Sequence, residues 1–304
     1  MTTRTRFAAD AAAATIATAF TATGPRLPIA RGAVLVLAFI SAPLATGQEQ
    51  DVQDLRDGKN FVATEVYSAE DDQRVLALYE GLRVADVSDG MDAVGLYDTG
   101  RMDREIAPLW RDTQQYKHRF IGIAVTARYV PTQHPRPTDM SVEDYDRWAS
   151  AWYGEKSSEP FVPLIREGTA LVIEDAAGAD VGSIGSNNIL GWKSRGCVGV
   201  VTSATARDTD EIITQQVPLY YQGPGRGIRP GRNEIESVNR PIVCGSAVVK
   251  PGDVIVADGD GVIVVPRAHA EKVAQYAHGI LEGDKAGRRS LYERLGLPLD
   301  DSVR

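Results

Sequence analysis

The chain has 304 residues, of which 43% are hydrophobic and 24% are charged, as in ordinary globular proteins. Its 41 acidic residues outnumber its 33 basic residues and give a net charge of -8, so no overall positive field attracts nucleic acid or anionic lipid. Collagen-like, coiled-coil and disordered classes are excluded by composition, and the length allows one large domain or two ordinary ones.

The first 47 residues have the pattern of a secretory signal peptide. Arg26 and Arg31 precede a short apolar run at residues 32–44, and a small-x-small sequence follows it. The run is shorter than the about 20 apolar residues of a membrane span, so no stable span is expected. We therefore predict export, for example to the periplasm. The alternatives are a mitochondrial-type presequence in residues 1–25, or a cytoplasmic protein in which residues 1–47 are a simple N-terminal extension.

Residues 48–70 are polar and are expected to form a leader segment. Apolar residues at helical spacing then predict a helix over residues 71–82. A second helix is expected to run through Val94, with Ser88 or Asp89 as its N-cap. A long β-type apolar run follows at residues 120–130.

Residues 131–161 interrupt the pattern with three prolines and then an acidic, aromatic stretch. We expect an inserted loop with a short helix, placed where it could cover a site. The alternative is a surface flap whose aromatic side chains pack on the domain.

After the insertion, strands and helices alternate. Strands are expected at residues 169–174, 198–202, 219–221, 240–249, 253–257 and 261–265, and helices at residues 187–195, 208–215, 268–282 and 288–295. Alternation of this kind predicts an α/β fold, and the closely spaced C-terminal strands add an antiparallel part, so the sheets should be mixed. Residues 71–304 therefore read as a single domain.

The cysteine and histidine residues restrict the chemistry. Cys197 and Cys244 lie in apolar, strand-like contexts and are expected to be buried free thiols, with a single disulfide as the alternative. The four histidines never occur at metal-ligand spacing, which argues against a zinc site. A bound metal should then be Mg²⁺ or Mn²⁺ on carboxylate, water and substrate oxygens.

A glycine-rich turn precedes the helix expected at residues 187–195. Gly182 and Gly185 let the backbone approach a ligand closely, and Ser186 could cap a helix that begins at Asn187. Backbone amides at a helix start attract anions, although such turns are also common without a ligand.

Arg207 and Asp208 follow the strand at residues 198–202 after a small, uncharged stretch. Ligands of open α/β sheets bind beyond the carboxyl ends of strands. There the arginine can hold a carboxylate and the aspartate a divalent cation. The alternative is a helix-capping aspartate beside a surface arginine. The basic loop at residues 223–232 could take a phosphate or carboxylate, or be a solvated loop or subunit contact.

Several ordered motifs together resemble the RraA-like family, which includes 4-hydroxy-4-methyl-2-oxoglutarate/4-carboxy-4-hydroxy-2-oxoadipate aldolases and regulators of ribonuclease activity. They lie at residues 84–90, 120–126, 185–188, 195–201, 207–208, 241–245 and 249–266. The resemblance implies an α/β/β/α swivelling-type domain that assembles into a homotrimer or hexamer, with sites between subunits.

The resemblance also assigns roles to single residues. In the aldolases, the residue that matches Asp208 holds the divalent metal, and the one that matches Arg207 grips the 2-oxo acid and stabilises its enolate. Backbone amides of the turn matching Gly185, Ser186, Asn187 and Asn188 bind the substrate carboxylate. Two departures occur. Ser203-Ala204 replaces a usual Asp-Gly, and Ser186 replaces an acidic residue.

We therefore expect a divalent-metal-dependent lyase that acts on a 2-oxo acid or related sugar acid by retro-aldol cleavage or decarboxylation. Asn187 and Asn188 could add side-chain contacts to substrate hydroxyls. One alternative is a non-catalytic binding or regulatory protein on the same fold. Another is an exported carbohydrate-processing enzyme with the same enolate chemistry, in which Trp148, Trp152 and Tyr153 would stack on a sugar.

Overall fold

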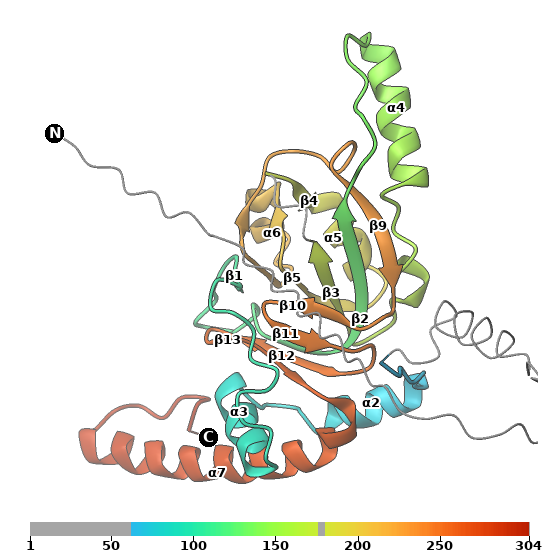
Figure 1. The fold of residues 1–304 in the computed structure, drawn as a ribbon. Coiled ribbons are helices and arrows are strands. Elements are labelled where there is room, and N and C mark those ends of the chain that lie inside the picture. Colours follow the sequence, from blue (N-terminus) through green and yellow to red (C-terminus); the bar gives the residue numbers. More distant parts are fainter. Residues whose placement is uncertain (1–61, 176–179, 304) are drawn as a thin grey trace, which may run out of the picture. The chain divides into compact units, whose positions relative to one another are not determined.

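The computed structural model (Figure 1) describes residues 62–175 and 180–303. The expected signal peptide at residues 1–47, and the expected leader as far as residue 61, lie outside the described residues. Within the described part of the chain, no helix combines the length and the apolar character that crossing a bilayer requires.

The fold is mixed α/β and is built on one eight-stranded sheet. The strand order is β1 (Ala107–Pro108), β7 (Leu219–Tyr221), β5 (Cys197–Thr202), β3 (Thr169–Asp175), β2 (Phe120–Pro131), β12 (Val254–Asp258) and β13 (Gly261–Val265), with β9 (Asn233–Val238) also paired to β2. Strands β2, β3, β5 and β7 are parallel, and the other pairs are antiparallel. The α/β alternation thus produces the parallel centre, and the closely spaced C-terminal strands form the antiparallel edge.

Two smaller sheets complete the β structure. One holds three short parallel strands, β4 (Gly182–Ile184), β6 (Thr205–Ala206) and β8 (Gly223–Pro224). The other is a hairpin of β10 (Ile242–Cys244) and β11 (Ala247–Val249). The single strand predicted over residues 240–249 is therefore wrong. Gly245 and Ser246 have φ values of +52° and +64°, the left-handed geometry of a two-residue hairpin turn, so the chain reverses there.

Three helices cover the β12–β13 side of the sheet: α2 (Ala69–Ala77), α3 (Val84–Ala93) and α7 (Ala270–Leu295). Figure 1 shows α3 beside α7, and the two pack through apolar residues that include Val87, Met91 and Val273. On another part of the sheet, α5 (Ser186–Lys193) and α6 (Thr209–Thr214) join a cluster with Leu171 and Val200. The β10–β11 hairpin contributes Ile242 and Val249 to a third cluster.

Several helix boundaries differ from the prediction. Helix α2 ends at Ala77 and not at Leu82. Helix α3 begins at Val84, so Ser88 and Asp89 lie inside it and are not its N-cap. Its first amides are satisfied by other carboxylates, because Arg83 N donates to Asp86 Oδ2 at 3.0 Å and Val84 N donates to Asp258 Oδ2 at 2.9 Å.

The two helices predicted near the C-terminus are one continuous helix, α7. The expected break at residues 283–287 holds glycines but no proline. Ion pairs one turn apart span it, from Lys285 to Glu282 at 3.6 Å and from Arg288 to Asp284 at 3.7 Å. The glycines therefore cost helix stability without ending the helix.

The segment at residues 131–161 forms α4 (Val142–Glu155), which projects away from the sheet in Figure 1. Ser141 caps the helix by accepting the Asp144 backbone amide at 3.1 Å. Near the base of α4, Trp152 is only 6% exposed and donates its indole N–H to the Asn233 carbonyl of β9 at 3.0 Å. Two 3-10 turns, Val162–Leu164 and Arg267–His269, complete the helical elements.

Both cysteines are buried and free, as predicted. Burial raises the pKa of Cys197 to about 11 and that of Cys244 to about 12, because a thiolate is poorly solvated in an apolar core. Neither thiol is therefore activated as a nucleophile at neutral pH.

Candidate active site

The small β4–β6–β8 sheet brings the two sequence motifs together. Parallel pairing aligns Ile184 at the end of β4 with Ala206 at the end of β6. Gly185 follows the first strand and Arg207 the second, and the Arg207 amide donates to the Ile184 carbonyl at 2.9 Å. Because carboxyl ends of parallel strands meet at one edge, the turn and the charged pair lie side by side.

Asp208 has a left-handed backbone conformation, and its carboxylate accepts a hydrogen bond from a helix other than the one it precedes. Its φ of +56° is left-handed, which is uncommon outside glycine, and it stands at the N-cap position of α6 without a side-chain cap there. Its Oδ2 accepts instead from the Ser186 backbone N at 3.1 Å and lies 3.4 Å from Ser186 Oγ. The carboxylate therefore sits at the start of α5, where the helix dipole favours negative charge.

Ser186 differs from its predicted role. It is the first residue of α5, with Gly185 as an N-cap that makes no side-chain bond. The Ser186 hydroxyl turns to Asp208 and not back to its own helix. Of the turn amides expected to bind a substrate carboxylate, the Ser186 amide is engaged by Asp208. The amides of Asn187 and Asn188, also in the first turn, have no acceptor within the helix.

Gly185 opens a small space among the polar groups, which we call the Gly185 cradle. A Cβ atom built on Gly185 would lie 2.9 Å from Asp208 Oδ2, 3.4 Å from Asn188 Oδ1 and 3.6 Å from Arg207 Nε. The φ of Gly185 is an ordinary -113°, so space and not backbone conformation calls for glycine here. Three side chains therefore converge on a volume that any larger residue would fill.

Arg207 and Asp208 are accessible to a ligand. Their side chains are 38% and 39% exposed, and Arg207 Nε lies 3.8 Å from Asp208 Oδ1. This loose ion pair leaves guanidinium donors for a bidentate carboxylate. Gly182 allows the close approach of Arg207, because a Cβ at Gly182 would lie 2.6 Å from Arg207 Cβ.

Glu159 and Arg229 were not predicted as site residues, but they are linked to the cradle through Asn188. Asn188 Nδ2 donates to Glu159 Oε1 at 2.6 Å, and Arg229 Nη2 donates to the same oxygen at 2.6 Å. Trp192 Nε1 donates to Glu159 Oε2 at 3.0 Å. Asn187, in contrast, is exposed. The insertion thus delivers a carboxylate to the cradle's edge.

The basic loop at residues 223–232 is not simply solvated, as one interpretation had it. Arg229 is 5% exposed, pairs with Glu159 and donates from Nη1 to Tyr129 OH at 2.8 Å. Arg226 pairs with Asp180, and Arg232 donates to the Ile228 carbonyl at 2.9 Å. These arginines already have partners within the chain, which weakens the phosphate-site interpretation of the loop.

The groups at the cradle suit a hard divalent cation. In the part of the chain that the structure describes, no three His, Cys, Asp or Glu side chains gather as a metal cluster. Mg²⁺ and Mn²⁺ need fewer protein ligands, because they retain waters and bind substrate oxygens. Asp208 offers a half-exposed carboxylate, and among residues 62–175 and 180–303 its Oδ1 is paired only loosely, with Arg207. The donor chemistry therefore fits such an ion at Asp208.

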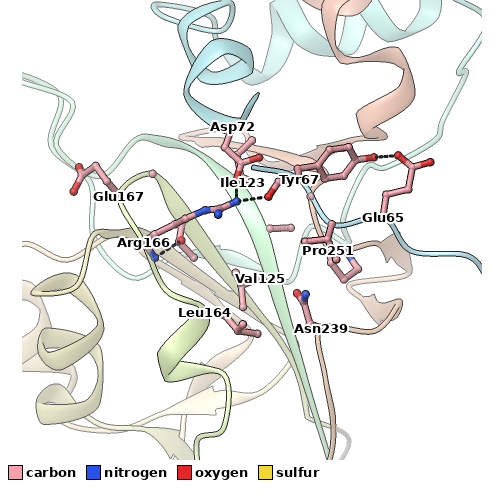
Figure 2. Close-up of a pocket in the computed structure, with 15 residues that line it drawn as sticks. Glu65, Tyr67, Asp72, Ile123, Val125, Leu164, Arg166, Glu167, Asn239 and Pro251 are labelled. Carbon is pink, nitrogen blue, oxygen red and sulfur yellow. Dashed lines mark hydrogen bonds and ion pairs between the residues drawn. The ribbon is translucent and has the colours of Figure 1, made fainter. Parts of the chain in front are cut away.

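A separate cavity of about 120 Å³ lies elsewhere on the domain (Figure 2). It adjoins Gly168 and Thr169 at the beginning of β3, whereas the Gly185 cradle follows carboxyl ends of strands. Beside this cavity, the buried Asp72 pairs with Arg166 and accepts from Arg267 Nη1 at 2.8 Å. The Asp72 carboxylate thus joins two arginines from distant parts of the sequence, so we interpret the cluster as structural.

The comparisons with known proteins agree with the motifs. The family model described as RraA-like, Aldolase/RraA, matches residues 84–264. A protein of Halalkalibacterium halodurans named "Putative 4-hydroxy-4-methyl-2-oxoglutarate aldolase" is 30% identical over 126 residues, or 41% of this chain. The match spans 60% of the length of that relative.

Solved structures show the same fold. Streptomyces coelicolor RraAS2, described as an unusual member of the RNase ES inhibitor RraA family, superposes with a TM-score of 0.58 at 18% identity, covering 72% of this chain and 98% of that one. A structure described as novel cellulases from microbes associated with the gut ecosystem gives a TM-score of 0.60 at 21% identity, covering 79% and 99%.

Proposed function

The chain belongs to the RraA-like family, and from that premise we propose that it is a lyase acting on a 2-oxo acid or related sugar acid, by retro-aldol cleavage or decarboxylation. We further propose that Asp208 holds a divalent cation, Mg²⁺ or Mn²⁺. The observation that carries the proposal is the convergence of Asp208, Arg207 and Asn188 on the Gly185 cradle.

Substrate binding falls to Arg207 and the start of α5. The guanidinium of Arg207 can grip a carboxylate with two parallel hydrogen bonds. The amides of Asn187 and Asn188 can donate to the same anion, helped by the positive end of the helix dipole. A small 2-oxo acid would then lie across the cradle beside Asp208.

The bond-breaking step leaves negative charge on the oxygen of the 2-oxo group. A divalent cation at Asp208 would supply Lewis-acid polarisation of that group. Arg207 places a permanent positive charge 3.8 Å from the Asp208 carboxylate, where it can stabilise the developing negative charge. The left-handed backbone of Asp208 and its bond to Ser186 hold the carboxylate in place before the substrate arrives.

The two alternatives, a non-catalytic regulator and a carbohydrate-processing enzyme, receive less support. A non-catalytic regulator needs no Arg207–Asp208 pair beside a glycine cradle. Sugar stacking on the aromatic insertion is disfavoured because its rings pack on one another. Trp152 is buried, and its ring centroid lies 5.7 Å from that of Trp148. Arg229 lies over the Tyr153 ring at 5.4 Å.

We also propose that the protein is a homotrimer or hexamer and is exported, as expected from the family and from residues 1–47. Light scattering on the purified protein tests the first point. N-terminal sequencing of the protein recovered from a periplasmic extract tests the second.

The activity can be tested directly with the full chain. Pyruvate release from 4-hydroxy-4-methyl-2-oxoglutarate and from oxaloacetate would be followed with Mg²⁺ or Mn²⁺, then with EDTA. We expect release that EDTA abolishes and that added Mn²⁺ restores. A folded protein that releases no pyruvate from either substrate would turn attention to the non-catalytic alternative.

A further inference from the structure

The carboxamide of Asn188 joins two features of the molecule. Its Nδ2 donates to Glu159 Oε1 at 2.6 Å. Its Oδ1 faces the Gly185 cradle, 3.4 Å from the position of a Cβ on Gly185. Asp208 Oδ2 lies 2.9 Å from the same position. An amide oxygen and a carboxylate oxygen therefore border one small volume.

Glu159 determines which way this amide points. A carboxylate can only accept hydrogen bonds, so the amino group of Asn188 must face it and the carbonyl oxygen must face the cradle. Glu159 is also held by Arg229, which is 5% exposed and donates from Nη2 to the same Glu159 oxygen at 2.6 Å.

Glu159 is itself fixed by three donors. Oε1 accepts from Asn188 Nδ2 and Arg229 Nη2, and Oε2 accepts from Trp192 Nε1. A glutamine in its place could not accept at both positions, because one would become an amino group. The full arrangement therefore needs a carboxylate from the insertion at residues 131–161.

We propose that Asn188 Oδ1 is a second protein oxygen for the divalent cation at Asp208, and that Glu159 is the positioning residue that orients it. The inference rests on the proposed cation at Asp208 and adds to it two residues of this chain. Amide and carboxylate oxygens are the ligands that Mg²⁺ and Mn²⁺ prefer. The insertion at residues 131–161 thus affects the site through the Glu159 carboxylate, while its aromatic side chains pack around the base of helix α4.

The test is Mn²⁺ binding to the full chain without substrate, measured from the electron paramagnetic resonance signal of free Mn²⁺. Asn188→Ala should raise the Mn²⁺ Kd about 10-fold, by the loss of one oxygen. Leu190→Ala is the control, because this side chain is 43% exposed on the same helix and has no role in the proposed site, and its Kd should stay within about twofold of wild type. Asp208→Asn should bind more weakly than either variant.

Glu159→Gln provides a second test that leaves Asn188 intact. It should raise the Mn²⁺ Kd several-fold, because the amide of Asn188 is no longer held in one orientation. Circular dichroism melts would confirm that each variant is folded.

The outcomes separate this inference from the proposed reaction. If Asp208→Asn loses Mn²⁺ while Asn188→Ala and Glu159→Gln bind as wild type does, the inference is overturned and the cation at Asp208 stands. If the variants weaken Mn²⁺ as expected but no substrate releases pyruvate, the inference stands and the proposed reaction is wrong. If the wild type binds no Mn²⁺, both fail.

Discussion

Asp208 precedes helix α6, yet its carboxylate accepts the backbone N–H of Ser186, the first residue of helix α5, at 3.1 Å. The bond links residues 22 apart in sequence and closes one side of the Gly185 cradle. It also explains why Asp208 makes no cap on its own helix. A left-handed backbone, uncommon for aspartate, turns the side chain across to α5.

Replacing Arg207 with lysine should remove most of the activity. Lysine keeps one positive charge but cannot form the two parallel bonds of a guanidinium with a carboxylate. We expect kcat/KM for the 2-oxo acid to fall about 100-fold, the effect of losing about 3 kcal/mol of binding in the transition state. The thermal midpoint should change little, because the side chain is 38% exposed. Wild-type turnover by Arg207→Lys would mean that the arginine does not bind the substrate.

Filling the cradle with a single methyl group gives a sharper test of its geometry. Gly185→Ala would place a Cβ 2.9 Å from Asp208 Oδ2, so the carboxylate must move, and we expect activity and Mn²⁺ affinity to fall at least about 10-fold. Gly191→Ala is the matched control in the same helix. A Cβ there meets no atom within 4 Å, and the change should raise stability by about 0.5–1 kcal/mol. Equal activity in the two variants would contradict the cradle.

The pH dependence of stability should report on His118. This side chain is 3% exposed, and its Nδ1 accepts the Asp112 amide at 3.1 Å. Burial, followed by the charges of Arg119 and Arg111, lowers the pKa of His118, against a smaller opposing effect of Asp258. Below about pH 6.5 the His118 side chain therefore binds a proton in the unfolded chain but not in the native protein. The free energy of unfolding should therefore decrease as the pH is lowered.

Urea unfolding at pH 7.5, 6.5 and 5.5 would measure this loss, which approaches about 1.4 kcal/mol per pH unit while only the unfolded state is protonated. His118→Asn keeps an acceptor for the Asp112 amide but cannot titrate, so its stability should depend less on pH. His134→Asn is the control, because the His134 side chain is 51% exposed. The same slope in wild type and His118→Asn would show that His118 is not the group responsible.

The sequence pattern predicted the elements whose apolar residues repeat strongly. Strand β2 and the parallel centre follow from local apolar runs, and the helix after β4 follows from the glycine-rich turn before it. Strand β9 was missed, because its residues alternate weakly and its pairing with β2 depends on tertiary structure. The β4–β6–β8 sheet was also missed, because strands of two or three residues carry no usable pattern.

The candidate site was likewise predictable from the sequence only in part. Arg207 and Asp208 could be found because they follow the predicted strand at residues 198–202, and Gly185 because it lies in a glycine-rich turn before a predicted helix. Glu159 could not, since it lies 29 residues before Asn188 in an insertion whose packing no local pattern determines. Arg229 was read as part of a basic loop, because nothing in the sequence shows that its side chain turns inward to Glu159.

The most direct test of the account compares wild type with Asp208→Asn in the pyruvate-release assay with Mn²⁺. Asparagine tolerates the left-handed backbone and keeps an oxygen for the Ser186 amide, so the fold should remain while the charge that holds the cation is lost. We predict EDTA-sensitive release by wild type and a rate at least about 100-fold lower for Asp208→Asn. Equal rates from the two proteins would contradict the assignment of the metal site to Asp208.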